Sequence, residues 1–245
     1  MIIRFQDGEL RKDAEASLST GADSVKRILT GNIAPEVPAV FIASAYDESN
    51  LITDVFALEN NVFTNITLND ESGQSAQTVR NYYVYSTDID NDKVIELPNT
   101  LALPSDPEDA GSENQYRIIW YNLSLDGERT DKISTYHNFG EGWFLYLPET
   151  WCQNLYVTRR RSKDGLTGTE LSLLAEGVRT PLLTVYAFSG ERAKALSESD
   201  GRILLTQRGD LYYSALLHAD AGLDAEQLRA RFSLIATDLL PGGEN

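Results

Sequence analysis

Four acidic side chains with regular spacing lie in residues 87–97, TDIDNDKVIEL. Asp88, Asp90 and Asp92 occupy alternate positions, and Glu96 follows four residues after the last of them. Acids at these positions bring their oxygens to one point if the chain curls, and Ca²⁺ binds to such a shell of oxygen ligands. The spacing therefore predicts a Ca²⁺ site. Because aspartate also favours turns, the alternative is a solvated acidic turn.

No motif of the sequence indicates a reaction. Cys152 is the single cysteine, so no disulfide forms within the chain. A lone cysteine is more often a small buried hydrophobe than a nucleophile served by a base such as His137 or His218. The chain contains no glycine-rich phosphate loop and no zinc-protease or serine-hydrolase signature. We therefore expect no catalytic residue and no cofactor other than Ca²⁺.

The composition is that of an ordinary globular protein with an acidic first half. The chain has 245 residues, 42% of them hydrophobic, and a net charge of −16. Residues 1–113 carry 20 acids and 7 bases, a balance of −13, whereas residues 114–245 carry 17 acids and 14 bases, a balance of −3. An acidic surface repels phosphate backbones, so no nucleic-acid partner is expected. It also disfavours direct binding to anionic membranes.

The first half is rich in short β segments separated by turn residues. Asp7-Gly8 predicts a tight hairpin, because this pair accepts the positive φ angles of such a turn. Strands are predicted on both sides of the acidic stretch, at residues 82–86 and 94–97. No helical periodicity occurs up to about residue 100. Residues 1–103 are therefore predicted to be an all-β section.

Residues 104–114, PSDPEDAGSEN, are the predicted linker, because they combine prolines, a glycine and acids without a large apolar residue. Residues 115–245 then predict an α+β domain, in which strands are followed by a short helix, two strands and a final helix. Asp224 and Gln227 have capping-box spacing at the start of that final helix. Its predicted apolar stripe consists of Leu228, Phe232, Ile235 and Leu239. The fold class predicted for the whole chain is β-rich and α+β.

The acidic stretch resembles the FG-GAP or VCBS-type repeat, in which DxDxDGxxE lies between strands of a propeller blade. The four acids match the acid positions of that repeat, whereas Lys93 stands where the family usually has glycine. That position commonly needs a left-handed backbone, which costs a lysine about 1 kcal/mol. A closed propeller typically needs about four blades or more. The resemblance therefore implies that residues 1–103 are an antiparallel section of partial, propeller-like blades.

The phrase GWFLYLPETW, residues 142–151, is similar to the opening of the Mog1/PsbP-like α+β fold. The order of the following elements agrees, including a buried strand at residues 182–188 and a short helix after it. Relatives of that fold mostly bind proteins. The combination with an FG-GAP-like section resembles uncharacterised cell-surface lipoproteins of Gram-positive gut bacteria. It implies an extracellular or cell-surface excerpt of a longer exported chain, which meets a membrane only through an upstream lipid anchor.

From these observations we expect a non-enzymatic, surface-associated protein that binds a protein or a glycan at the cell surface. One alternative is a hydrolase or glycan-processing enzyme that uses carboxylates of the β section. Two carboxylates about 5–9.5 Å apart across a cleft would favour it. A second alternative is an intracellular scaffold, with a cytoplasmic location if Met1 is the native start.

Overall fold

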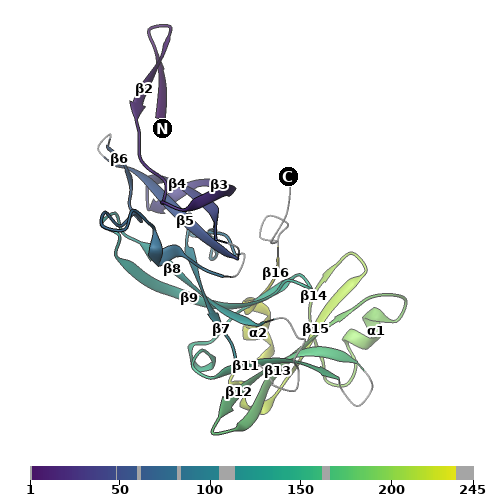
Figure 1. The fold of residues 1–245 in the computed structure, drawn as a ribbon. Helices are drawn as coiled ribbons and strands as arrows, with labels where there is room; N and C mark the ends of the chain where they lie inside the picture. The colour runs from purple at the N-terminus through teal and green to yellow at the C-terminus, as the bar shows by residue number, and fades with distance from the viewer. Residues whose placement is uncertain are drawn as a thin grey trace. The chain divides into compact units, whose positions relative to one another are not determined.

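The chain forms several antiparallel sheets and few helices, as the sequence predicts (Figure 1). Contacts within the chain divide it into two compact units. The first holds the residues up to Thr100 together with Ile119–Ile133, and the second holds Leu101–Ile118 and Ser134–Ala236. The division differs from the predicted one because Ile119–Ile133, beyond the predicted linker, belong to the first unit. The computed structural model describes residues 2–47, 49–59, 62–81, 84–104, 114–161 and 166–235.

The first unit begins with the predicted hairpin, a separate two-stranded sheet of β1 and β2. Asp7 and Gly8 form its turn with φ of 55° and 81°, the left-handed backbone that the sequence predicts there. A four-stranded antiparallel sheet follows, with its strands in chain order. The strands are β1 (Ile2–Gln6), β2 (Glu9–Ala14), β3 (Ala22–Ala34), β4 (Val37–Tyr46), β5 (Asn50–Glu59) and β6 (Val62–Asn65).

One face of the sheet β3–β6 carries the core of the first unit. Side chains alternate between the two faces of a strand, and the register sets Leu29 opposite Phe41 and Phe41 opposite Val55. Phe41 and Val55 are almost completely buried, and they pack in one cluster with Leu97 and Tyr121. A short 3₁₀ helix, η1 (Ala76–Thr78), follows the sheet in the chain.

A second antiparallel array has the strand order β16-β10-β9-β8-β7. Leu103 donates a backbone hydrogen bond to the carbonyl of Gln115 over 2.8 Å, on either side of the predicted linker. Residues 105–113 of that linker lie outside the described part of the chain. The strands are β7 (Leu97–Ala102), β8 (Tyr116–Leu123), β9 (Arg129–Asn138), β10 (Trp143–Tyr146) and β16 (Phe232–Leu234).

The second unit also contains a five-stranded antiparallel sheet with the order β11-β12-β13-β15-β14. Its inner face packs in one cluster with Trp143 and Trp151 from the segment resembling the Mog1/PsbP-like opening. Trp151 lies in a 3₁₀ helix, η3 (Glu149–Trp151), and its indole N–H donates to the carbonyl of Ala221. The other elements are β11 (Leu155–Arg161), β12 (Thr167–Ala175), β13 (Val178–Phe188), α1 (Ala193–Ser197), β14 (Ile203–Arg208), β15 (Leu211–Leu217) and η4 (Ala219–Ala221).

The final helix is shorter than predicted. The capping box of Asp224 and Gln227 is present, but α2 (Ala225–Arg231) ends after seven residues. Phe232 then adopts an extended backbone and pairs with Leu145 of β10. The new strand makes a hydrogen-bonded ladder and packs the ring of Phe232 against Trp143, and this tertiary pairing overrides the helical spacing. Ile235 follows the strand, and Leu239 lies outside the described residues. Among the described residues, no helix is long and apolar enough to cross a bilayer.

Candidate functional site

The acidic stretch forms a closed loop in the first unit. Thr87 and Glu96 exchange two backbone hydrogen bonds of 3.2 and 2.9 Å. The first predicted flanking strand is wrong in its described part, since residues 84–86 are not strand. Of the second, residues 94–97, only Leu97 lies in a strand, where β7 begins, and Glu96 forms an isolated bridge with Thr87. The other described apolar residues of these segments are buried although they lie in a loop, and a buried loop has the same apolar composition as a buried strand. The backbone N–H of Ile95 donates to the carbonyl of Asn32, so this side of the loop is held by β3.

Buried aliphatic residues hold both arms of the acidic loop in the core. Ile89, Val94 and Ile95 are each less than a tenth exposed, whereas Asp90 and Asp92 are exposed. Burying apolar side chains on both arms of the loop turns the intervening polar side chains outward. The loop is therefore anchored by the core of its unit, and the carboxylates of Asp90 and Asp92 remain exposed.

Asp88 organises the backbone of the loop. Its carboxylate oxygens accept hydrogen bonds from the backbone N–H groups of Asp92 and Lys93, over 3.0 and 2.9 Å. Asn91 and Lys93 both have positive φ, at 63° and 74°. Lys93 thus has the left-handed backbone for which the resembled repeat uses glycine. The carbonyl of Lys93 accepts a hydrogen bond from the side chain of Asn32, which helps to hold that backbone.

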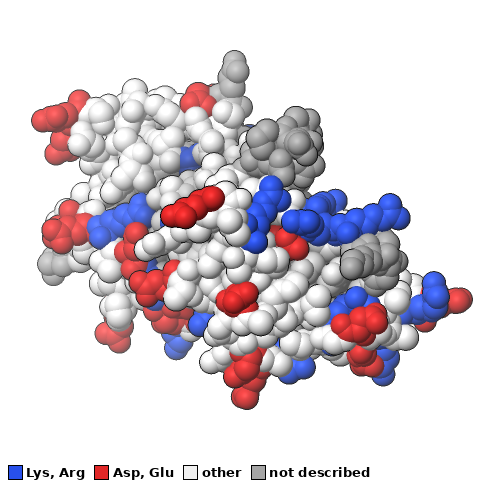
Figure 2. Space-filling view, turned by 90° about the horizontal axis from the view of Figure 1, so that it is seen from below, with Lys and Arg blue, Asp and Glu red and all other residues white. Residues whose placement is uncertain are grey.

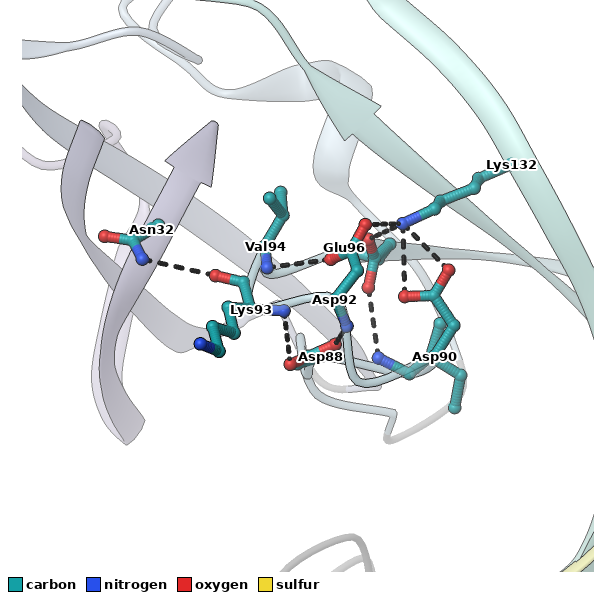
Figure 3. A network of polar contacts seen from close by, with 9 residues as sticks. Asn32, Asp88, Asp90, Asp92, Lys93, Val94, Glu96 and Lys132 are labelled. Carbon is teal, nitrogen blue, oxygen red and sulfur yellow. Dashed lines mark hydrogen bonds and ion pairs between the residues drawn. The ribbon is translucent and has the colours of Figure 1, made fainter. Parts of the chain in front are cut away.

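The other three acids of the loop bind a single ammonium group. Lys132 extends from β9, and its Nζ donates to Asp90 and to Glu96, with contacts of 2.9 Å to Oδ2 and Oε1 (Figure 3). The same Nζ donates to Oδ2 of Asp92. Glu96 is completely buried and accepts a second hydrogen bond, from the backbone N–H of Ile89, on its other oxygen. The chain itself therefore supplies a cation at the point where the acids converge.

The pKa values of these groups follow from burial and from Lys132. Burial raises the pKa of Glu96 above its usual range, although the hydrogen bonds from Lys132 and Ile89 oppose the shift. The hydrogen bond from Lys132 lowers the pKa of Asp92. Burial tends to lower the pKa of Lys132 itself, but its hydrogen bonds to Asp90, Asp92 and Glu96 outweigh that effect and raise it. Lys132 is therefore a charged ammonium at neutral pH.

The donor set can be compared with what Ca²⁺ requires. Asp88, Asp90 and Glu96 each offer an oxygen, and these oxygens lie within 4.8 Å of one another. Ca²⁺ takes about six to eight oxygen ligands. Because the Nζ of Lys132 is already bonded to Asp90 and Glu96, an ion at this point must displace it. The Ca²⁺ site at Asp88, Asp90, Asp92 and Glu96 stays a prediction. The geometry adds the condition that Ca²⁺ must displace the ammonium of Lys132.

Sequence reasoning missed Lys132, which is 36 residues from Glu96 and 42 from Asp90. No local pattern connects such distant positions. The one available signal was the charge itself, because four acids within nine residues need a counter-charge. Lys132 was one of several bases that could have provided it.

A second polar centre of the first unit was also missed. Asp54, on β5, is completely buried, and one of its oxygens accepts hydrogen bonds from the hydroxyls of Ser19 and Ser75, each over 2.7 Å. The backbone N–H of Ser19 donates to the other oxygen, and the side chain of Asn65 donates to the first. The charge is met by four donors from three separate segments. Asp54 therefore joins these segments to β5 and offers no free oxygen for catalysis.

The residues considered for thiol catalysis are not brought together. Cys152 is half-buried, and its thiol donates to the carbonyl of Pro148 over 3.4 Å. Burial lowers the pKa of His137 to about 3, so its ring is neutral at pH 7. His218 makes a 3.3 Å contact to the hydroxyl of Thr184. Within the part of the chain that the structure describes, no hydrogen bond joins Cys152 to either histidine.

Comparison of the chain with known families and proteins gives no match. No family model matches the sequence, no curated protein is significantly similar to it, and no solved structure is significantly similar to it.

Proposed function

We propose that this protein is a non-enzymatic binding protein that contacts another protein through hairpin β1–β2, as part of an exported, surface-associated chain. The proposed partner presents an extended segment with alternating apolar side chains. The observation that carries the proposal is the exposed apolar face of the hairpin.

The hairpin has one face on which three apolar side chains are open to solvent, beside Lys12, which the register sets opposite Ile3. Phe5 is paired with Leu10 across the two strands, and Ile3 lies two residues from Phe5 on the same side. These three side chains are 70%, 73% and 51% exposed. Amphipathic two-stranded sheets usually cover their apolar face, and a hairpin alone is marginally stable in water. A partner that covers this face would bury its apolar side chains and stabilise the hairpin.

The backbone of the hairpin fits the same kind of partner. Among the strands that the structure describes, β1 and β2 pair only with each other, so each has an edge whose N–H and C=O groups no other described strand pairs. An extended peptide can add to such an edge, and its alternate side chains then lie beside Ile3 or Leu10. The second face of β2 carries Glu9 and Arg11, which are exposed and charged. The apolar face is therefore the one available for docking.

The acidic loop supports a non-enzymatic function. Asp90, Asp92 and Glu96 share the ammonium of Lys132, and Asp88 binds the backbone of the loop. Carboxylates of a glycosidase must instead be free to face a substrate from two sides. On the face drawn in Figure 2, acidic and basic side chains are interspersed, and we include no nucleic acid among the partners.

The proposal extends to the ancestry of the two sections. The four consecutive antiparallel strands β3–β6 have the size of one propeller blade, which supports a propeller-like origin of residues 1–103. The strand Trp143–Tyr146 followed by η3 with the buried Trp151 supports a Mog1/PsbP-like origin of residues 115–245. The proposed location at the cell surface rests on the resemblance of this pair of sections to cell-surface lipoproteins.

The test is a selection of extended peptides from a displayed random library on the full chain. Wild-type protein should enrich peptides with alternating apolar residues, and the double variant Phe5→Ser, Leu10→Ser should lose them. Val178→Ser is the matched control, because Val178 is 66% exposed but belongs to the β12–β13 hairpin of the second unit. Peptides that bind the double variant equally well would overturn the docking site. Turnover of a chromogenic glycoside or ester that Asp90→Asn abolishes would overturn the non-enzymatic function.

A further inference from the structure

The chain contains four Asp-Gly pairs, which begin at Asp7, Asp126, Asp164 and Asp200. Because glycine has no side chain to block the approach, its backbone nitrogen can attack the carboxyl group of the preceding aspartate. The product is a five-membered succinimide, which water opens to aspartate or to isoaspartate. The reactivity of each pair depends on how firmly the folded chain holds it. Asp164 lies outside the described residues.

The pair Asp126-Gly127, in the turn between β8 and β9, is held on both sides of the reacting bond. The backbone N–H of Gly127 donates to the carbonyl of Ser124 over 3.0 Å, and the hydroxyl of Ser124 donates to Oδ1 of Asp126. The second of these hydrogen bonds lowers the pKa of Asp126, which keeps its carboxyl in the ionised form that a nitrogen attacks least. Both reacting groups are therefore engaged.

The pair Asp200-Gly201 is held through its carboxylate. Oδ2 of Asp200 accepts hydrogen bonds from Nη2 of Arg202 over 2.9 Å and from the hydroxyl of Ser199 over 3.0 Å. The side chain of Arg202 is itself fixed, because it is 4% exposed and its Nε donates to the carbonyl of Leu196. The carboxylate can reach the nitrogen of Gly201 only after its two bonds break.

The pair Asp7-Gly8 lies in a turn that opens easily. It connects the strands of a two-stranded sheet, β1 and β2, which no other described strand joins. Both residues are exposed, and a side chain placed on Gly8 would meet nothing within 4 Å. A two-stranded hairpin is marginally stable in water by itself. Its local unfolding therefore needs little free energy, whereas the other two described pairs adjoin strands of five-stranded sheets.

Opening of the hairpin also permits the rotation that the reaction needs. In the closed turn, Asp7 and Gly8 have φ of 55° and 81°, the left-handed backbone of a type I′ turn. The succinimide ring forms only when the nitrogen of Gly8 rotates toward the side chain of Asp7, and this rotation breaks the turn. The closed hairpin thus protects the pair, and the open hairpin lets it react.

We propose that Asp7 is a site of spontaneous isoaspartate formation, which proceeds when the hairpin opens. The nitrogen of Gly8 forms a bond to Cγ of Asp7, and the hydroxyl of the carboxyl group leaves as water with the amide proton. Water then adds to the backbone carbonyl carbon of Asp7, and the bond from that carbon to the nitrogen of Gly8 breaks. The main chain afterwards runs through Cβ and Cγ of Asp7, with no oxidant or reductant consumed.

Isoaspartate at position 7 would disable the docking hairpin, a consequence that rests on the proposed function. It adds one atom to the main chain of a turn that has two residues, and the length of such a turn sets the register of the two strands. The altered turn no longer places Phe5 opposite Leu10. Conversion of Asp7 therefore removes the docking face.

The test is peptide mapping of the full chain, stored at mildly acidic pH and physiological temperature and sampled over several weeks. Mass spectrometry with electron-transfer fragmentation distinguishes isoaspartate from aspartate. Isoaspartate should accumulate at Asp7 about tenfold faster than at Asp126 or Asp200. In urea the three rates should become similar, because the fold no longer protects any pair. Equal rates in the folded chain, or an undiminished difference in urea, would overturn the proposal.

A reversible disulfide tests whether opening of the hairpin controls the reaction. The double variant Ile3→Cys, Lys12→Cys places thiols on two residues that the register sets opposite each other. The oxidised form should convert Asp7 about tenfold more slowly than the reduced form of the same protein, because the disulfide keeps the strands together. Equal rates in the two forms would overturn hairpin opening as the cause.

Binding of the selected library peptides distinguishes the isoaspartate site from the proposed function. Stored wild type should lose these peptides as Asp7 converts. Stored Asp7→Glu should keep them, because the longer side chain does not form the five-membered ring and glutamate already precedes glycine in a turn of the same kind at Glu176, with φ of 50°. Undiminished binding by converted protein would overturn the effect on docking. If fresh wild type binds no peptide, the proposed function fails, whereas the mass spectra still decide the isoaspartate site.

Discussion

The ammonium of Lys132 donates a hydrogen bond to the buried carboxylate of Glu96 over 2.9 Å, although the two residues are 36 positions apart. Glu96 in turn holds the backbone of Ile89, at the opposite arm of the loop. This one pair therefore connects β9 to both ends of the acidic loop.

Replacing Lys132 with methionine should destabilise the protein by about 2–3 kcal/mol. The variant leaves the buried charge of Glu96 without its cation, and breaking a buried pair is costly, although partial exposure of Lys132 reduces the effect. Urea denaturation measures the change. Lys26→Met is the control, because Lys26 is exposed on β3, and it should change the stability by less than about 0.5 kcal/mol. A Lys132 variant as stable as this control would show that the ammonium has no stabilising role.

The same variant should make the protein respond to Ca²⁺. Without Lys132, Asp90 and Glu96 lose the ammonium between them, and their oxygens can surround an ion together with an oxygen of Asp88. In chelator-treated samples, Ca²⁺ should therefore raise the melting temperature of Lys132→Met more than that of wild type. Adding Asp90→Ala to the variant should remove the response. A Ca²⁺ shift in neither protein would refute the metal site at this loop.

Lys93→Gly should stabilise the protein by about 1 kcal/mol. Lys93 has a φ of 74°, and a left-handed backbone costs a residue with a Cβ about 1–2 kcal/mol, part of which the greater freedom of glycine in the unfolded chain offsets. Lys93→Ala is the control, because alanine keeps the Cβ while removing the charged side chain. Denaturation midpoints decide whether backbone strain or the charge of Lys93 causes the effect. A higher midpoint in both variants would assign the gain in stability to removal of the charge.

His137 should make stability depend on pH in the acid range. Burial lowers the pKa of His137 to about 3 in the folded chain, whereas an unfolded histidine titrates near 6.5. The unfolded state therefore binds more protons between these values, and stability falls as the pH falls from about 6.5 toward 3. Between pH 7 and 3.5 the wild type should lose up to about 4 kcal/mol more than His137→Leu.

Phe144→Leu is the control for the histidine experiment. Its ring stacks on His137 with centres 4.9 Å apart, so the substitution disturbs the same packing without removing a titrating group. This variant should keep the wild-type slope of stability against pH. If His137→Leu keeps that slope too, the acid sensitivity belongs to the carboxylates.

Asp54→Asn should destabilise the protein by about 3 kcal/mol. Asp54 accepts four hydrogen bonds while completely buried, and an amide turns one of its acceptor oxygens into a donor that faces other donors. Asp70→Asn is the control on an exposed turn and should have little effect. Urea denaturation of the two variants gives the comparison, and equal midpoints would contradict a structural role for Asp54.

Local features of the fold could be predicted from the sequence, and long-range ones could not. The turn at Asp7-Gly8 and the capping box at Asp224 depend on residues close together in the chain, and both predictions are confirmed. The predicted end of α2 is wrong, because Phe232 belongs to strand β16, which pairs with β10. Helical spacing in the sequence cannot reveal this pairing. The acids of the loop were found by their spacing, whereas Lys132 was missed, because only the tertiary fold brings β9 to them.

The ion pairs between Lys132 and the acids of the loop affect the conditions under which the loop keeps its shape. A metal ion leaves when its concentration in the surroundings falls, and a loop that depends on it then opens. An ammonium carried by the same chain is always present at a high effective concentration. With the ammonium of Lys132 in place, the loop of residues 87–96 can keep the shape described above when calcium is removed.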